Sequence, residues 1–195
     1  MMIKYIKMTD ILVMDTSSIL DFNKFYIFDK NNSSEVYSKL INFLIEKIKS
    51  GEIIILDKVY NEISDNKYTC DLKKRIRNLC TDTLFLFEKV QELITKYTRR
   101  EIIDMLNFSG DEVEKCLRDY EEKIADLYLA AYCNFLKGCG KNPVLITEET
   151  FTDDKKIIEK IPNICKNEKI QFQKIPYVLF EIYKKELEFE LKVNS

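Results

Sequence analysis

The chain of 195 residues contains no histidine. This absence excludes Ser-His-Asp and Cys-His nucleophile arrangements and the histidine acid–base cleavage of RNA. The six cysteines form no CxxC pair, so we expect free thiols and no zinc site. Any hydrolysis by this chain must use carboxylates, lysines, tyrosines or a metal ion held by oxygen ligands. Oxygen-only ligation favours Mg²⁺ or Mn²⁺.

Glycine and proline are also scarce, with 4 and 3 residues, and no linker rich in Gly, Ser or Pro divides the chain. We therefore predict a single domain over residues 1–195. The composition, 46% hydrophobic and 33% charged, is typical of a globular protein. No apolar run reaches the ~18 residues of a transmembrane helix. No signal peptide is evident either, so we expect a cytoplasmic protein that does not enter a membrane.

The net charge of −2 is not the strongly basic signature of a nucleic-acid-binding protein. It does not exclude nucleic acid as a partner, because basic side chains can gather on one face while acids gather in a site. Two local basic groups exist, at 73–77 and at 96–100. A solvated helix face is the simpler interpretation of both groups.

Short apolar runs mark the predicted strands. Residues 11–14, 53–56 and 143–146 are continuous apolar runs that end at polar residues, as buried parallel strands do. A weaker fourth strand is predicted at 170–172. Because these strands alternate with helical periodicity, we predict an α/β sandwich around a central parallel sheet.

Helical periodicity fills the segments between these strands. Helices are predicted from Tyr37 to Ile48 with a stop at Gly51, after Asp57, from Asp126 to Leu136, within 154–167 around Ile161 and Pro162, and at 176–187. The charged stretch from Asp71 to Tyr120 predicts two or three more helices, with a break at 107–110 where Ser109 or Asp111 caps the next helix. We interpret about 66–122 as a helical insertion in the domain.

Acidic residues follow the predicted inner strands. Asp15 follows the first, Glu62 lies on the helix after the second, and Glu148 and Glu149 follow the third. In an open parallel sheet the carboxyl ends of the strands share one edge, and neighbouring strands lie ~4.8 Å apart. Asp126 begins a helix with small residues and can join them. The sequence therefore predicts that chain-distant carboxylates converge at one edge of the sheet.

Such a cluster needs compensation. Two like charges ~4 Å apart repel by about 4 kcal/mol at an effective dielectric of 20. Either some of the acids hold protons, or a divalent cation neutralises them. A metal ion held by carboxylates can lower the pKa of a bound water and offset charge on a departing oxygen. This chemistry hydrolyses a phosphodiester without a side-chain nucleophile.

Each acid taken alone also has a simpler interpretation. Asp15 fits a turn or a helix cap, and Glu62 fits an exposed helix position. Asp126 fits a helix-start acid favoured by the helix dipole, and Glu148 with Glu149 fits a polar turn. The whole set in this order is far less expected by chance than any one member.

Four segments of the chain resemble the PIN-domain nucleases, which include the VapC-type toxins of bacterial toxin–antitoxin pairs. They are ILVMDTSSILDF at 11–22, IIILDKVYNEI at 53–63, IADLYLAAYC at 124–133 and PVLITEETF at 143–151. A fifth piece, KIPNIC at 160–165, is similar to a PIN subfamily of unassigned function. The resemblance spans most of the chain through short motifs.

The resemblance implies a PIN-like three-layer sandwich with the strand order 3-2-1-4-5, dependence on Mg²⁺ or Mn²⁺, and cleavage of RNA. It assigns Asp15, Glu62 and Asp126 as metal ligands and catalytic acids. The family usually carries Asp at the fourth position, where this chain has Glu149, and Glu148 competes for that role. Both glutamates are therefore candidate metal ligands.

Three hydroxyl residues are candidate supporting groups. Thr16, Ser17 and Thr147 adjoin the acids in sequence. We expect Thr16 or Ser17 to hydrogen-bond a carboxylate or a metal-bound water, although a plain turn role fits them equally. In the hypothesis, water attacks phosphorus and leaves 5′-phosphate and 3′-hydroxyl ends.

Two other functions remain open. A PIN-like domain that binds RNA or a protein partner without cutting is the first, since Glu replaces Asp at the fourth position and the insertion is long. Phosphatase or receiver chemistry at Asp15 is the second, but Ser17 stands where a second Asp would be needed. The family also implies the toxin role in a type II toxin–antitoxin pair, with a small antitoxin partner and a homodimer.

Overall fold

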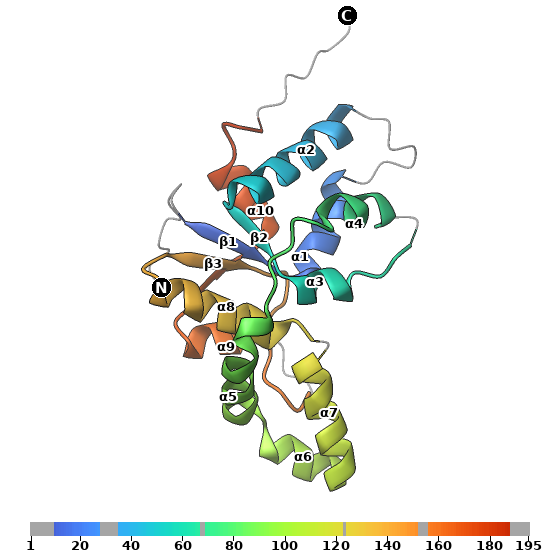
Figure 1. Cartoon of the computed structure of the whole chain (residues 1–195), viewed down its shortest axis with the longest axis vertical. Coiled ribbons are helices and arrows are strands. Elements are labelled where there is room, and N and C mark those ends of the chain that lie inside the picture. Colours follow the sequence, from blue (N-terminus) through green and yellow to red (C-terminus); the bar gives the residue numbers. More distant parts are fainter. Residues whose placement is uncertain (1–9, 28–34, 67–68, 123, 152–155, 188–195) are drawn as a thin grey trace, which may run out of the picture.

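The computed structural model describes residues 10–27, 35–66, 69–122, 124–151 and 156–187. Its centre is a four-stranded parallel sheet with the order β2-β1-β3-β4. The strands are β1 (Ile11–Met14), β2 (Ile53–Ile55), β3 (Pro143–Ile146) and β4 (Gln171–Gln173). The sequence therefore predicted the α/β class and the parallel sheet correctly (Figure 1).

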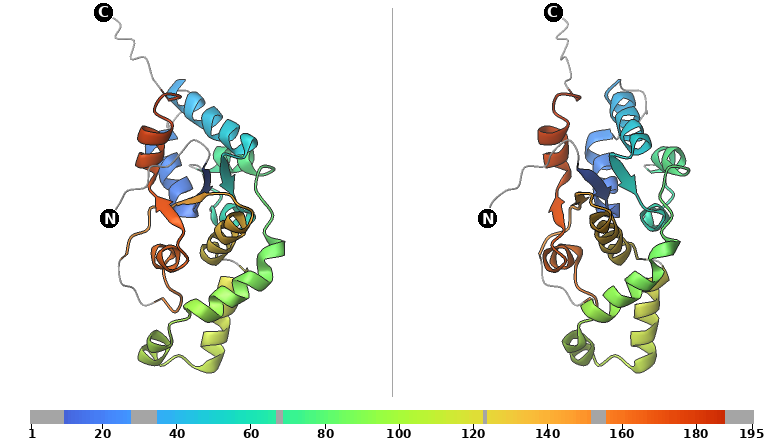
Figure 2. Two further views of the ribbon diagram at one scale, coloured as in Figure 1. Left: turned by 90° about the vertical axis from the view of Figure 1, so that its left-hand side faces the viewer. Right: turned by 60° about the vertical axis from the view of Figure 1, so that its left-hand side comes forward.

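Helices cover both faces of this sheet. In the views of Figures 1 and 2, α2 (Glu35–Ser50) and α10 (Ile175–Tyr177) lie on one side, and α8 (Asp126–Gly138) and α9 (Ile161–Asn167) on the other. The inner strands are buried on both faces for this reason, which explains their unbroken apolar sequence. The architecture is an α/β sandwich.

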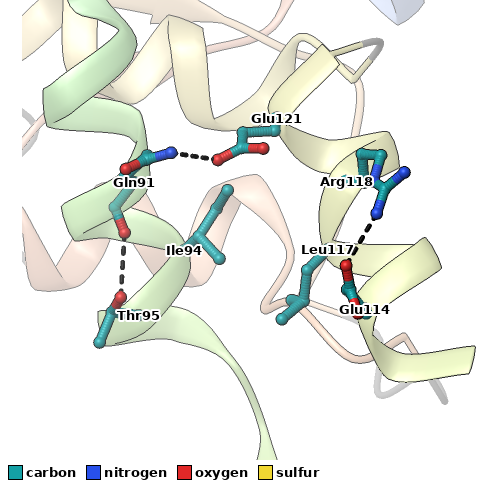
Figure 3. A pocket seen from close by; sticks show the side chains of 7 residues that line it. All are labelled: Gln91, Ile94, Thr95, Glu114, Leu117, Arg118 and Glu121. Atoms are coloured by element: carbon teal, nitrogen blue, oxygen red, sulfur yellow. Dashed lines mark hydrogen bonds and ion pairs between the residues drawn. The ribbon is translucent and has the colours of Figure 1, made fainter. Parts of the chain in front are cut away.

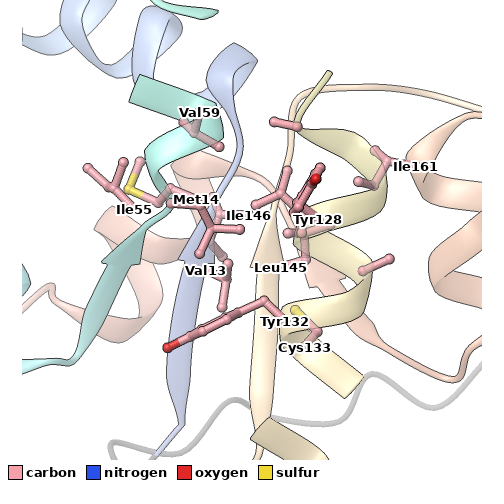
Figure 4. Packing of buried hydrophobic residues seen from close by; sticks show 14 of the residues in the cluster. Val13, Met14, Ile55, Val59, Tyr128, Tyr132, Cys133, Leu145, Ile146 and Ile161 are labelled. Atoms are coloured by element: carbon pink, nitrogen blue, oxygen red, sulfur yellow. The ribbon is translucent and has the colours of Figure 1, made fainter. Parts of the chain in front are cut away.

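The core lies between β1, β3 and α8. Val13, Leu145 and Ile146 are fully buried, and Tyr128 and Cys133 of α8 pack over them (Figure 4). Complete burial of such an aliphatic side chain contributes about 1.5–3 kcal/mol relative to exposure. The small residues of α8 at 130 and 131 are also fully buried, which lets this helix approach the sheet closely.

The predicted strand order 3-2-1-4-5 is wrong for the described residues, which form four strands and not five. The predicted order places a further strand beside β2, at the edge of the sheet. Within the described residues the chain forms only a single parallel bridge there, between Leu56 and Thr81. The Thr81 amide donates to Ile55 O at 2.8 Å, and the Asp57 amide donates to Thr81 O at 2.9 Å. A helical turn begins at Leu84, only three residues later, so the pairing ends before a strand forms.

Two helices predicted from periodicity are confirmed. The helix predicted at 37–48 is α2, and Gly51 follows it with φ of +77°. A left-handed residue ends many helices, and glycine adopts it without strain. The helix predicted at 126–136 is α8. The short helix predicted at Asp57 is confirmed as well, as α3 (Asp57–Glu62). After β1, where no helix was predicted, the chain enters α1 (Thr16–Asp21) and the π-helical segment η1 (Phe22–Ile27).

The stretch between 66 and 122 is helical, as predicted, but it holds four α-helices among its described residues instead of two or three. They are α4 (Cys70–Ile76), α5 (Phe87–Tyr97), α6 (Arg100–Leu106) and α7 (Gly110–Glu122), with the 3-10 turn η2 (Leu84–Leu86). The predicted break is confirmed at Asn107, which has φ of +51°. Ser109 then caps α7: its hydroxyl accepts from the Glu112 amide at 3.3 Å, and its own amide donates to the Glu112 carboxylate at 2.8 Å.

The C-terminal helix predicted at 176–187 is wrong in extent. The chain forms α10 and the π-helical segment η3 (Val178–Ile182), and turns follow Tyr183. The helix predicted within 154–167 is confirmed only as α9, and its residues 154 and 155 lie outside the described part. All six cysteines are free thiols, as predicted. In the described part of the chain, no helix is long and apolar enough to cross a membrane.

Candidate functional site

The register of the sheet brings the ends of three strands together. Met14 lies opposite Ile55 on one side and Ile146 on the other. Asp15, the residue after β1, therefore lies beside Thr147, and the Asp15 amide donates to Ile146 O at 3.0 Å. This is the edge at which the sequence places the acidic residues.

Asp15 is buried, with 5% of its surface exposed, and it caps α1. Its Oδ1 accepts from the Ser18 amide at 2.6 Å, and Ser17 Oγ lies 3.0 and 2.9 Å from its two oxygens. Burial raises the pKa of Asp15, and hydrogen bonds from Thr147, Ser18 and Ser17 oppose that rise. The helix-cap interpretation of Asp15 is thus confirmed, and its position at the edge is compatible with a further role.

Ser17 links the ends of β1 and β3. Its hydroxyl donates to Asp15 and accepts from the Glu148 amide at 3.1 Å. The expectation that Thr16 or Ser17 hydrogen-bonds a carboxylate is met by both residues, because Thr16 Oγ1 donates to the carboxylate of Glu62. Thr147 is fully buried, and its hydroxyl accepts from the Glu149 amide at 3.1 Å.

Glu148 and Glu149 have different surroundings. Glu148 Oε1 accepts from the Ile175 amide at 2.7 Å, and Oε2 lies 4.0 Å from Lys174 Nζ, so this carboxylate is engaged at the start of α10. Glu149 Oε2 is buried and has no hydrogen-bond partner among the described residues. Glu149, and not Glu148, is therefore the glutamate whose carboxylate remains available at this edge.

Glu62 joins three elements. It ends α3, its Oε2 accepts from Thr16 at the start of α1, and its Oε1 accepts from the Ala125 amide at 2.8 Å. Ala125 is the N-cap residue of α8, and its side chain makes no capping hydrogen bond. A carboxylate at a helix N-terminus is stabilised by the unpaired amides and the helix dipole.

Asp126 is the electrostatic centre of the cluster. Its pKa is raised to about 7, first by burial and then by the negative charges of Glu149, Glu62 and Asp15, while Lys156 opposes the rise. The acids predicted for the first, second and fourth positions, Asp15, Glu62 and Glu149, thus all act on Asp126, the acid predicted for the third. The raised pKa favours the protonated form of Asp126 more strongly than is usual for an aspartate.

The donors fit a hard divalent cation by type, since they are all carboxylate oxygens and one of them is buried without a partner. As the side chains lie, no three His, Cys, Asp or Glu residues in the described part of the chain form a ready group of metal ligands. Asp15 and Glu62 are turned toward amides and hydroxyls instead. Binding of a cation would therefore require these side chains to exchange hydrogen bonds for the ion.

Sequence reasoning missed two groups of this site. Lys156 lowers the pKa of Asp126, and the Ala125 amide holds Glu62. No pattern could have found Lys156, because isolated lysines are common in this chain. The Ala125 amide could have been suspected, because α8 begins without a capping side chain and its first amides need an acceptor.

A groove lies elsewhere, between α5 and α7. It encloses about 430 Å³ and is lined by Gln91, Ile94, Thr95, Glu114, Leu117, Arg118 and Glu121 (Figure 3). Its polar groups bond to one another: Gln91 donates to Glu121, and Arg118 donates to Glu114 at 2.8 Å. Because no acid of the sheet edge contributes to its lining, this groove is not the carboxylate site.

Comparison with known families places most of the chain in one of them. Residues 12–183 match the family described as "Domain of unknown function (DUF4411)". The chain belongs to this family. The matched range includes all the acids of the sheet edge, so the carboxylate cluster lies inside the DUF4411 domain. No curated protein and no solved structure matches the chain.

Proposed function

We propose that this DUF4411 protein is a divalent-metal-dependent endoribonuclease of PIN type. The observation that carries the proposal is the gathering of acids around the partly buried Asp126 at the carboxyl edge of the sheet. Glu62 accepts from the amide that precedes Asp126, and Asp15 follows the strand that pairs with β3. Burial and the charges of Glu149, Glu62 and Asp15 accordingly raise the pKa of Asp126. A protein retains such repulsion at a cost in stability, and perturbed carboxyl groups are typical of functional sites. The resemblance of four segments to PIN nucleases supports the same reaction.

In this proposal Asp126 and Glu149 would hold Mg²⁺ or Mn²⁺, with Asp15 and Glu62 acting directly or through water. A bound ion would supply a water of lowered pKa and offset charge on the departing oxygen. Ser17 and the Ser18 amide orient Asp15, and Thr147 orients the Glu149 backbone. Thr16 and the Ala125 amide hold Glu62 toward α8.

The proposed biological role is the toxin of a type II toxin–antitoxin pair. It rests on the resemblance to VapC-type toxins, and it brings two further proposals with it: a small antitoxin that covers the acidic edge and a homodimer. The C-terminal segment 176–187 is apolar enough to permit such a dimer, and Phe180 of η3 is exposed in it.

The second candidate is a PIN-like domain that binds RNA or a protein without cutting. One observation favours it: no three carboxylates in the described part of the chain already form a metal-ligand group. In that case the proton on Asp126 and the charge of Lys156 would compensate the acids permanently.

The two candidates are separated by RNA cleavage with and without EDTA. We expect the parent protein to cut RNA in the presence of Mg²⁺ or Mn²⁺ and EDTA to abolish the cutting. Asp15→Asn, Asp126→Asn and Glu149→Gln should each reduce the rate by at least about 100-fold, as expected for loss of a group that holds the catalytic ion. Products with 5′-phosphate ends would agree with attack by water.

Glu148→Gln is the matched control. It makes the same chemical change one residue away, and the Gln oxygen can still accept from the Ile175 amide that Glu148 now holds. We expect it to keep most of the activity. Equal loss in Glu148→Gln and Glu149→Gln would contradict the assignment of Glu149, and EDTA-resistant cleavage would contradict the metal.

A further inference from the structure

An exposed aromatic ring lies next to the carboxylate edge. Phe151 follows Glu149 by two residues, so their Cα atoms are no more than about 7 Å apart. The side chain of Phe151 is 57% exposed. More than half of this large apolar residue is thus exposed, although it lies two residues from an acid of the sheet edge.

The ring is held in place from one side. It packs on Phe172 of β4 in an edge-to-face contact, with the ring centroids 5.7 Å apart and an interplanar angle of 64°. Phe172 is itself partly buried against the core. A contact of this kind is worth about 0.5–1.5 kcal/mol beyond area burial and orients the ring, which leaves the rest of its surface open to a planar group.

A positive charge lies just after the strand that carries Phe172. Lys174 follows β4 directly, two residues after Phe172, and precedes α10. Its side chain is 53% exposed, with Nζ 4.0 Å from Glu148 Oε2. An aromatic face, a nearby ammonium group and carboxylates together suit a nucleotide, whose base stacks while its phosphate faces the cations.

We propose that Phe151 is a stacking platform for one base of single-stranded RNA, positioned so that a neighbouring phosphate lies at the edge formed by Asp126 and Glu149. This inference rests on the proposed nuclease function, and it adds the requirement for an unpaired base. Paired bases in a duplex keep their faces stacked on one another, so a hairpin stem cannot use the platform. Phe151 is a positioning residue here and takes no part in the chemistry.

The test is RNA binding in the Asp126→Asn background with Mg²⁺ present, so that cleavage does not interfere. The probe is a single-stranded RNA of about ten nucleotides that carries 2-aminopurine, a length within the range such sites cover. We expect Phe151→Leu to weaken binding by roughly 5- to 100-fold and to abolish the stacking-dependent quenching of 2-aminopurine. Phe151→Trp should restore both the binding and the quenching. A hairpin that contains the same sequence as one strand of its stem should bind weakly to every variant.

Phe85→Leu is the matched control. Phe85 is 58% exposed and also stands in an edge-to-face pair, with Phe135 at 5.1 Å. Phe135 lies nine residues along α8 from Asp126, which is about 13 Å at 1.5 Å per residue. Loss of an exposed Phe at this distance should leave binding and quenching unchanged.

The outcomes separate the inference from the nuclease proposal. RNA binding that depends on Phe151, together with no RNA cutting by the parent protein, would support the stacking platform and overturn the nuclease. Metal-dependent cutting with equal binding by Phe151→Leu would overturn the platform alone. Absence of RNA binding, or equal losses in Phe151→Leu and Phe85→Leu, would also overturn it.

Discussion

The carboxylate of Glu62 accepts a 2.8 Å hydrogen bond from the backbone amide of Ala125, 63 residues away in the sequence. The same carboxylate accepts from Thr16, so one acidic group fixes the ends of α3, α1 and α8 relative to one another. Glu62 thus holds the start of α8, where Asp126 is the first residue, beside α1 and α3. A structural role and a place in the acid cluster coexist in a single residue.

This relationship separates stability from activity at Glu62. Glu62→Ala removes the acceptor at the start of α8 and should lower the free energy of unfolding by about 1 kcal/mol, as loss of a helix cap does. Glu62→Gln keeps an oxygen that can accept from the Ala125 amide, so its stability should fall less than that of Glu62→Ala. The same change removes the negative charge that would attract a metal ion. Urea unfolding and RNA cleavage of both variants check this. Equal destabilisation by the two would show that the amide contact contributes nothing.

The raised pKa of Asp126 predicts how stability depends on pH. Its folded pKa of about 7 exceeds the ordinary value of 3.8, so between these values the folded state binds more protons than the unfolded state. Stability should therefore fall as pH rises from about 4 to about 7. Asp126→Asn has no carboxyl group at this position and should not lose stability in this way. The free energy of unfolding of Asp126→Asn relative to the parent protein should therefore rise by up to about 4 kcal/mol between pH 4 and pH 8 in EDTA. Urea unfolding at both pH values measures it; identical pH dependence in parent and variant would contradict it.

Binding of the proposed ion should reverse the difference in stability between Asp126→Asn and the parent protein. At pH 8 we expect Mn²⁺ to raise the melting temperature of the parent protein, because the ion neutralises the carboxylates and binds the folded state alone. An ion at 100 times its dissociation constant would add about 2.7 kcal/mol. Asp126→Asn and Glu149→Gln should respond weakly, and Glu148→Gln like the parent. A uniform response in all four proteins would mean that Mn²⁺ binds elsewhere.

The convergence of the acids could be predicted because it follows from topology. The apolar runs at 11–14 and 143–146 are β1 and β3 at those bounds, since strands buried on both faces have no polar alternation to blur their ends. Parallel pairing then places Asp15 beside Thr147. The orientation of each carboxylate could not be predicted, because Glu148 and Glu149 are identical residue types side by side, and contacts distant in sequence, such as the Ile175 amide on Glu148, distinguish them.

The wrong predictions concern the periphery. The position outside β2 depends on one backbone bridge at Thr81, which no side-chain pattern encodes. The C-terminal segment has helical periodicity, yet its hydrogen bonding widens after Tyr177 into a π-helical turn. Such edges are decided by a few backbone contacts, whereas the centre of the sheet is decided by many buried apolar side chains.

Glu168 connects α5 to α8, and removal of its carboxylate should loosen that connection. Its carboxylate accepts from Lys96 at 2.6 Å, Tyr97 at 2.5 Å and Asn134 at 2.7 Å, joining α5 to α8. Burial raises its pKa, but these bonds outweigh burial and lower it from 4.5 to about 2. The stabilisation is therefore present above pH ~4.5 and lost as pH falls toward 2, and Glu168→Gln should cost up to about 3 kcal/mol at pH 7 but little near pH 2. Glu114→Gln, which breaks the exposed pair with Arg118, should cost less than about 0.5 kcal/mol, and equal losses in the two variants would contradict the role of Glu168.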